Sequence, residues 1–248
     1  MIGVKEYASD QEEQARSDMH YLLNEHLIPD DQVLSNLGLF LTSKNLSRIL
    51  FLNYIYQQIV DIHGVVMDFG TRWGQNLAVF AALRGIYEPF NRHRKLIGFD
   101  TFSGFPNISA KDGLSDLMQK GNISVTDHYQ RHLEEIMKCQ EDNNPLSHIK
   151  KFEIIAGDAC KTLQSYLSIN PHSIVALAYF DFDLYEPTKV CLDLIKDRLV
   201  KGSVLCFDEL NDPDSPGETL AVMEALGLNN IRLQRWKHVS RISYAVFE

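Results

Sequence analysis

Short apolar runs alternate with helical segments along most of this 248-residue chain, and this alternation limits the possible folds more than any other feature. Strands alternating with helices form parallel βαβ units with right-handed crossovers. The sequence therefore predicts an α/β fold, with a mostly parallel sheet of about seven strands flanked by helices. The predicted strands are 64–69, 95–100, 152–157, 173–183, 203–209, a short run around Ile231, and 242–247.

The segment before the first strand, residues 1–62, shows apolar residues at helical spacing and contains no strand pattern. Thr42 and Ser43 are suitable N-caps for its last helix. Its polar, acidic start lacks the apolar region of a secretory signal. We therefore expect an N-terminal helical cap over 1–62 and a ligand-binding domain over 63–248.

The charge balance disfavours nucleic acid as the main partner, because 33 acidic residues outnumber 24 basic ones. No apolar run approaches the roughly 18 residues that span a bilayer, so no membrane segment is expected. The four cysteines are scattered and form no CxxC pair. This pattern is typical of reduced thiols in a cytoplasmic enzyme.

The turn after the first strand contains two glycines and reads Asp68-Phe69-Gly70-Thr71-Arg72-Trp73-Gly74. It matches neither the G-x-G-x-x-G fingerprint nor a P-loop. Gly70 permits a positive φ, and Gly74 lets the next helix begin close to a ligand. A plain tight turn is the alternative interpretation.

Acidic residues also follow the second and third strands. Asp100 could accept hydrogen bonds from ribose hydroxyls, or it could be a solvated or capping aspartate. Asp158 and Ala159 could meet an adenine edge, or Asp158 could simply cap the next helix.

The fourth and fifth strands end in four acids: Asp181, Asp183, Asp208 and Glu209. Carboxylates packed together repel, and a hard cation such as Mg²⁺ or Ca²⁺ relieves that repulsion. Alternatively, they cap helices or pair with Lys189 and Arg198.

Two further patterns lie outside the strand ends. His128 and His132 are four residues apart in a predicted helix over 124–143 and could face the site, although solvated histidines are commoner. Ser215 and Glu218 fit a capping box at the start of a helix over 215–227.

Together these stretches resemble class I S-adenosylmethionine-dependent methyltransferases, and more narrowly the macrocin O-methyltransferase family, which methylates sugar hydroxyls on natural products. The resemblance implies a Rossmann-like methyltransferase fold. The matching stretches are VVMDFGTRWGQNLA (65–78), GFDTFSGFP (98–106), IIAGDACKTL (154–163), VALAYFDFDLYEPTK (175–189) and KGSVLCFDELNDPDSPGE (201–218).

The resemblance implies a cofactor site for S-adenosylmethionine. The glycine turn would hold its amino-acid end, the second strand its ribose, and the third strand its adenine. Arg72 stands where the generic class has a glycine. The residues so implied are Asp68, Gly70, Thr71, Arg72 and Gly74 for the turn, Asp100 with Ser103, and Asp158 with Ala159.

The resemblance also implies a Mg²⁺ site formed by Asp181, Asp208 and Glu209. Many family members have Asp-Asp where this chain has Asp208-Glu209. The cation would lower the pKa of an acceptor hydroxyl. Asp181, or less favourably His128, would take its proton.

The expected function is therefore Mg²⁺-dependent O-methylation of a hydroxylated or glycosylated small molecule, with the N-terminal helices and the 101–130 loop as a lid. A homo-oligomer is expected from the resemblance. The alternatives are a nucleotide-cofactor oxidoreductase and a non-catalytic nucleoside-binding or scaffold domain.

Overall fold

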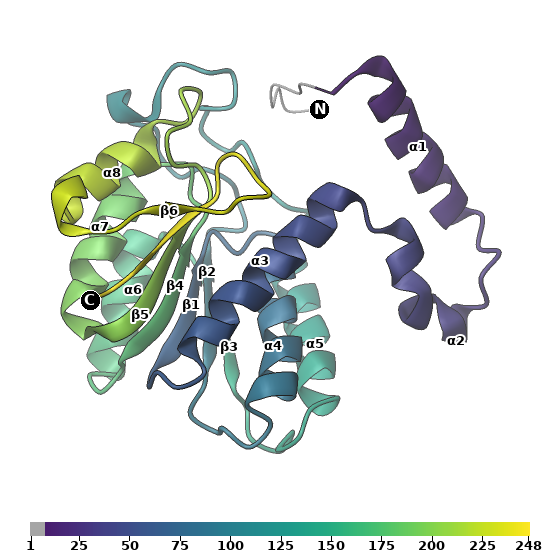
Figure 1. Ribbon diagram of the computed structural model, residues 1–248, viewed down its shortest axis with the longest axis horizontal. Coiled ribbons are helices and arrows are strands. Elements are labelled where there is room, and N and C mark those ends of the chain that lie inside the picture. Colours follow the sequence, from purple (N-terminus) through teal and green to yellow (C-terminus); the bar gives the residue numbers. More distant parts are fainter. Residues whose placement is uncertain (1–7) are drawn as a thin grey trace.

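The computed structural model describes residues 8–248, and its α/β architecture has a central sheet between two layers of helices (Figure 1). Residues 1–7 of the predicted N-terminal cap lie outside the described part. The α-helices are α1 (Asp10–Asn24), α2 (Asp30–Val33), α3 (Ser43–Ile59), α4 (Gln75–Tyr87), α5 (Tyr129–Asp142), α6 (Ala159–Ile169), α7 (Tyr185–Ile195) and α8 (Gly217–Ala225). Short 3-10 turns are η1 (Leu34–Phe40), η2 (Ala110–Asp112), η3 (Lys196–Arg198) and η4 (Leu228–Asn230).

The sheet has the strand order β3-β2-β1-β4-β5-β7-β6. The first five strands are parallel, and β7 runs antiparallel to both β5 and β6. The chain winds outward from β1 in one direction and from β4 in the other, so the topological switch point lies between them. The bounds are β1 (Val65–Phe69), β2 (Leu96–Asp100), β3 (Phe152–Ala156), β4 (Val175–Phe180), β5 (Leu199–Phe207), β6 (Gln234–Arg235) and β7 (Ser243–Val246).

Each face of the sheet has its own apolar core. Helices α3, α4 and α5 cover one face, and α6, α7 and α8 cover the other (Figure 1). Strands β1 and β4 are buried along their whole length, as expected for central strands covered on both faces. The predicted α/β fold with a mostly parallel sheet is confirmed. The predicted strand over 173–183 is shorter, however, since β4 ends at Phe180 and frees Asp181 and Asp183 for the loop.

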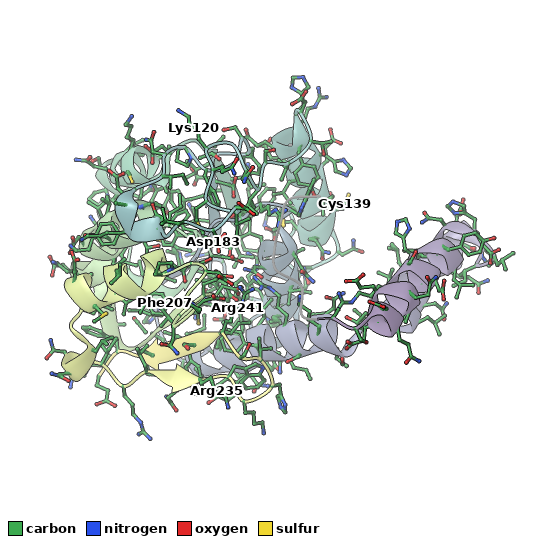
Figure 2. All side chains as sticks on the ribbon, turned by 90° about the horizontal axis from the view of Figure 1, so that it is seen from above. Lys120, Cys139, Asp183, Phe207, Arg235 and Arg241 are labelled. Atoms are coloured by element: carbon green, nitrogen blue, oxygen red, sulfur yellow. The ribbon has the colours of Figure 1, made fainter. Side chains whose placement is uncertain are left out.

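The N-terminal segment divides into two parts. Helix α3 packs on the sheet, with Phe51, Leu52 and Ile55 fully buried, and Thr42 caps it as predicted. Residues 10–40 bury no side chain, and α1 projects away from the body in both views (Figures 1 and 2). The functional boundary of the 1–62 cap stays a prediction.

Within residues 8–248, no helix combines the length and the apolar character that crossing a membrane requires.

Candidate active site

A cavity of about 390 Å³ opens at the carboxyl ends of β1 to β5. This volume is in the range of small-molecule sites, and its position at the switch point is where open α/β sheets bind ligands. The loop after β2 forms one wall through Phe105, Leu117 and Ile123. Of the predicted site residues, Gly70, Thr71, Arg72, Asp100, Asp158, Ala159, Asp181, Asp208 and Glu209 line this cavity.

The glycine turn begins the site. Gly74 has φ +79° at the N-cap of α4 and provides no side-chain cap, so the first amides of that helix have no side-chain acceptor from the N-cap. Arg72 adopts φ +48°, and its backbone N–H donates to Asp100 Oδ2 over 2.7 Å. The turn after β1 is thereby tied to the end of β2.

Asp68 lies beneath this turn and is fully buried. One of its oxygens, Oδ1, accepts a hydrogen bond from Asn76 Nδ2 over 3.0 Å, while Oδ2 has no partner among the described residues. Burial raises the pKa of Asp68 to about 6. Asp68 does not line the cavity, but Asn76 does. Asn76 therefore stands between the predicted residue and any ligand.

The ends of β2 and β3 supply the far wall. Asp100 accepts from the Phe102 N–H over 2.6 Å through Oδ1, so two backbone donors hold its carboxylate in place. Burial raises the pKa of Asp100. Asp158 accepts from the Cys160 N–H over 3.0 Å, which is the capping interpretation, and it also faces the cavity.

Besides Asp68, three predicted residues lie outside the cavity lining. Gly74 and Ser103 are not part of the cavity lining, and Ser103 is exposed. His128 is exposed at the N-cap of α5 and also lies outside the lining, so the structure does not bring it to the acids.

The acids that follow β4 and β5 converge. Asp181, Asp208 and Glu209 each offer a carboxylate oxygen within 4.8 Å of the others. Glu209 Oε2 is buried and has no partner among the described residues, while Oε1 lies 3.3 Å from Arg241. Burial, reinforced by the neighbouring carboxylates, raises the pKa of both Asp181 and Glu209 well above the ordinary value. A bound cation would relieve the repulsion among these carboxylates.

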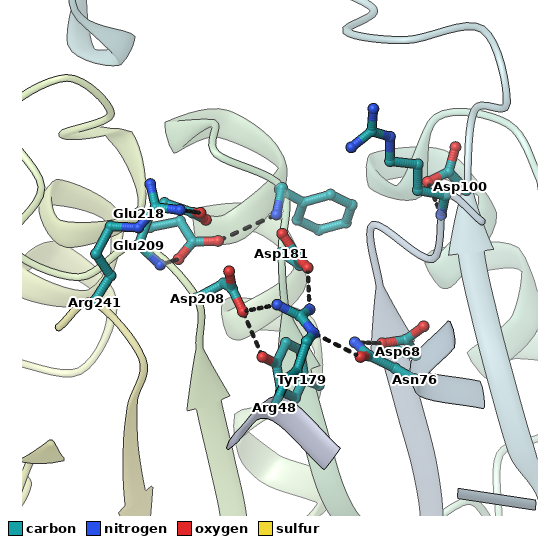
Figure 3. A network of polar contacts seen from close by, with 12 residues as sticks. Arg48, Asp68, Asn76, Asp100, Tyr179, Asp181, Asp208, Glu209, Glu218 and Arg241 are labelled. Atoms are coloured by element: carbon teal, nitrogen blue, oxygen red, sulfur yellow. Dashed lines mark hydrogen bonds and ion pairs between the residues drawn. The ribbon is translucent and has the colours of Figure 1, made fainter. Parts of the chain in front are cut away.

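The nearest cation to two of these acids is Arg48 from α3, which sequence reasoning missed. Its Nη2 lies 2.7 Å from Asp181 Oδ2, and its Nη1 lies 2.8 Å from Asp208 Oδ1 (Figure 3). The expected alternative partners bind elsewhere: Lys189 pairs with Asp193, and Arg198 donates to backbone carbonyls.

A signal for Arg48 was present in the sequence. It precedes Phe51, Leu52 and Ile55 by three, four and seven residues, so it lies on the helix face that those residues bury. A lone charge on a buried helix face indicates an acidic partner.

The capping box predicted at Ser215 and Glu218 is wrong. Pro216 occupies the N-cap, with no side-chain cap hydrogen bond. Glu218 is instead fully buried and accepts from the backbone N–H groups of Phe182 (3.1 Å) and Glu209 (3.2 Å). The physical reason is that the chain ends of β4 and β5 leave backbone donors buried, and these compete for the carboxylate.

Comparison with solved structures identifies relatives over nearly the whole chain. The chain is similar to CalS11, a calicheamicin methyltransferase, with 37% identity, TM-score 0.95, and coverage of 98% of this chain and 95% of that one. It is likewise similar to the apo structure of CalS11, described as a TDP-rhamnose 3′-O-methyltransferase, with 35% identity, TM-score 0.87, and coverage of 98% and 96%.

A more distant structure, the O-methyltransferase NovP, shares the fold at 16% identity and TM-score 0.61, with 81% of this chain and 79% of that chain covered. No protein-family model and no curated protein sequence matches the chain. The near-complete coverage by CalS11 confirms the resemblance seen in the sequence. The chain belongs to the family of class I O-methyltransferases that includes the calicheamicin methyltransferase CalS11.

Proposed function

We propose that this enzyme transfers a methyl group from S-adenosylmethionine to a sugar hydroxyl, with the help of a divalent cation, in natural-product biosynthesis. The observation that carries the proposal is the juxtaposition of the turn held by Asp100 with the Asp181–Asp208–Glu209 cluster in one cavity. Similarity to CalS11 supports the sugar as acceptor class, since that protein is a TDP-rhamnose 3′-O-methyltransferase. The relatives are methyltransferases, which leaves the oxidoreductase and scaffold alternatives without support.

The cofactor supplies an electrophilic methyl group when bound. In the proposal, the carboxylate of Asp100 would accept hydrogen bonds from the ribose hydroxyls. Each of its oxygens accepts one hydrogen bond from a backbone N–H and can accept another. Asp158 and Ala159, which line the cavity, would lie beside the adenine. The amides at the start of α4 and the buried Asp68–Asn76 pair would hold the amino-acid end.

The residues present fit a hard divalent cation. Three carboxylates approach one another within 4.8 Å, and the orphaned Glu209 Oε2 is buried in the cluster. Oxygen ligands alone suit Mg²⁺ or Ca²⁺ rather than zinc. A cation held there would lower the pKa of a hydroxyl that binds it.

Asp181 is the proposed base. It lies at the switch point beside the glycine turn and lines the cavity in which the acceptor would bind. S-adenosylmethionine would supply the methyl group to the acceptor oxygen with cleavage of its carbon–sulfur bond, and Asp181 would receive the hydroxyl proton. The loop wall at Phe105 and Leu117 shields this step from water.

A homo-oligomer completes the proposal. The segment over residues 10–41 exposes a series of large apolar side chains that the body of the chain does not cover, and a second copy would cover them. They are Tyr21, Leu22, Leu23, Leu27, Leu34, Leu37, Leu39 and Leu41.

A direct test combines binding and turnover. S-adenosylhomocysteine should raise the melting temperature of the protein, whereas NADH should not. Incubation with S-adenosylmethionine, Mg²⁺ and TDP-rhamnose should give a singly methylated sugar by mass spectrometry, and chelation with EDTA should stop the reaction. Stabilisation by NADH alone would refute the proposal.

A further inference from the structure

Arg48 is the cation that the described structure places on Asp181 and Asp208, whereas Arg241 contacts Glu209. Its side chain is 24% exposed. Arg48 lies in the N-terminal half of α3, one turn before the residues that anchor this helix in the core. Burying a guanidinium is costly unless carboxylates compensate it. Its contacts should therefore be read as part of the site and not as part of the apolar packing of α3.

The contacts of Arg48 use only one oxygen of each acid. The guanidinium fork binds Asp181 Oδ2 and Asp208 Oδ1, and the Tyr179 hydroxyl donates to the same Oδ1 of Asp208 over 2.5 Å. The Arg48 Nε donates to Asn76 Oδ1 over 3.3 Å, and the guanidinium carbon lies 5.5 Å from the centre of the Tyr179 ring. Arg48 is thus held from four sides.

The remaining oxygens face away from Arg48. Figure 3 shows the second oxygen of Asp181 and of Asp208 pointing away from the guanidinium. Glu209 belongs to the same cluster, and its Oε2 is buried and has no hydrogen-bond partner within residues 8–248. A buried carboxylate oxygen without a donor is costly, and a cation bound at this place would satisfy it.

We propose that Arg48 is the positioning residue of this cation site: it fixes one oxygen each of Asp181 and Asp208 and so aims their other oxygens, together with Glu209 Oε2, at a divalent cation. The inference rests on the cation of the proposed function. Side chains that hydrogen-bond to metal ligands in this way orient the groups that bind the metal directly. Arg48 also links the N-terminal segment to the chemistry, because α3 begins where residues 10–41 join the body.

The rival interpretation is that Arg48 occupies the cation's place and must leave before the cation binds. The two interpretations predict opposite changes in metal affinity when Arg48 is replaced. A nearby positive charge repels a cation, so removing a blocking arginine would tighten metal binding. Removing a positioning arginine frees two mutually repelling carboxylates and weakens metal binding.

The experiment measures Mn²⁺ binding by electron paramagnetic resonance and calorimetry in the wild-type protein, Arg48→Gln, Arg48→Lys and Lys44→Gln. Lys44 is an exposed cation on the same helix and serves as the matched control for lost charge. We expect Arg48→Gln to bind Mn²⁺ about 10-fold or more weakly. Arg48→Lys keeps the charge but loses the two-pronged guanidinium, so its Mn²⁺ affinity should lie between those of wild type and Arg48→Gln. The Mn²⁺ affinity of Lys44→Gln should match wild type.

S-adenosylhomocysteine affinity without metal separates this inference from the proposed function. It should change far less than Mn²⁺ affinity in Arg48→Gln, because Arg48 touches the proposed cofactor site only through its 3.3 Å bond to Asn76. Failure of wild type to bind S-adenosylhomocysteine overturns the proposed function. Normal cofactor binding with unchanged or tighter Mn²⁺ binding in Arg48→Gln overturns the role of Arg48 only. If Arg48→Gln does not fold, Arg48→Lys decides: Mn²⁺ affinity equal to wild type overturns the inference.

Discussion

Gly70 and Asp181 approach so closely that no side chain fits between them. A Cβ atom on Gly70 would lie 2.0 Å from the carbonyl oxygen of Asp181, and Gly70 has φ +84°. The backbone hydrogen bond from the Asp181 N–H to the Phe69 carbonyl, 2.9 Å long, holds the two strand ends together. The turn proposed for the cofactor and the acid proposed as base are therefore one rigid unit.

Gly70→Ala should lower the free energy of unfolding by about 2–5 kcal/mol, since it combines a strained φ with a backbone clash. Gly121→Ala is the matched control, because Gly121 has φ +82° and no atom of the described residues lies within 4 Å of an added Cβ. Denaturant melts of both variants give the comparison. Equal losses would show that φ alone matters and that the contact with Asp181 does not.

Asp100→Ala should weaken S-adenosylhomocysteine binding by about 1–3 kcal/mol through the loss of hydrogen bonds to a charged acceptor. It also releases the Arg72 and Phe102 N–H groups that shape the turn. Isothermal titration calorimetry measures the affinity, with exposed Asp127→Ala as control. An unchanged affinity would remove Asp100 from the cofactor site.

The sequence could predict which residues meet at the site, because parallel strands place their carboxyl ends at one edge of the sheet. That rule alone was enough to group Asp181 with Asp208 and Glu209, which the structure brings within 4.8 Å. The rule could not predict the contact between Arg48 and Asp181, which are 133 residues apart in sequence. That contact depends on how α3 packs across the sheet.

Glu218 shows a second limit of prediction from sequence, because a local pattern gave the wrong role for this residue. The spacing from Ser215 fits a capping box, but the Glu218 carboxylate accepts instead from the N–H groups of Phe182 and Glu209, which follow β4 and β5. Local sequence patterns assume a solvated helix end, and tertiary structure overrides them when buried donors compete.

Asp181→Asn should reduce turnover by about 10²–10⁴-fold, the usual contribution of a positioned base. Affinity for S-adenosylhomocysteine without metal should be unchanged, because the proposed cofactor contacts come from other residues. Single-turnover methyl transfer and calorimetry measure the two quantities, with exposed Asp197→Asn as control. Parallel loss of turnover and cofactor affinity would contradict the role of base.

Residues 10–41 should mediate self-association through their exposed leucines. Leu27 and Leu34 are 82% and 80% exposed, and Leu27→Asp with Leu34→Asp should shift the protein toward monomer in light scattering. Ile169→Asp is the control, because Ile169 is 79% exposed on the body of the protein. A monomeric wild type, or an oligomer indifferent to both leucine substitutions, would refute the proposed interface.

Asp68 should make the protein less stable as the pH rises. Its pKa is about 6 in the folded state and about 3.9 in an unfolded chain. Between these values the folded state holds a proton that the unfolded state has released, so stability falls as pH rises from about 4 to 6 and then levels off. Asp68→Asn keeps an acceptor for Asn76 but does not titrate.

The difference in unfolding free energy between Asp68→Asn and wild type should therefore move in favour of the variant across this window, by up to about 2–3 kcal/mol. Urea melts at a series of pH values measure it, and contributions from the other acids cancel in the difference. Saturating S-adenosylhomocysteine should reduce the shift if its ammonium group stabilises the ionised carboxylate. A difference that stays constant with pH would show that Asp68 titrates normally in the folded protein.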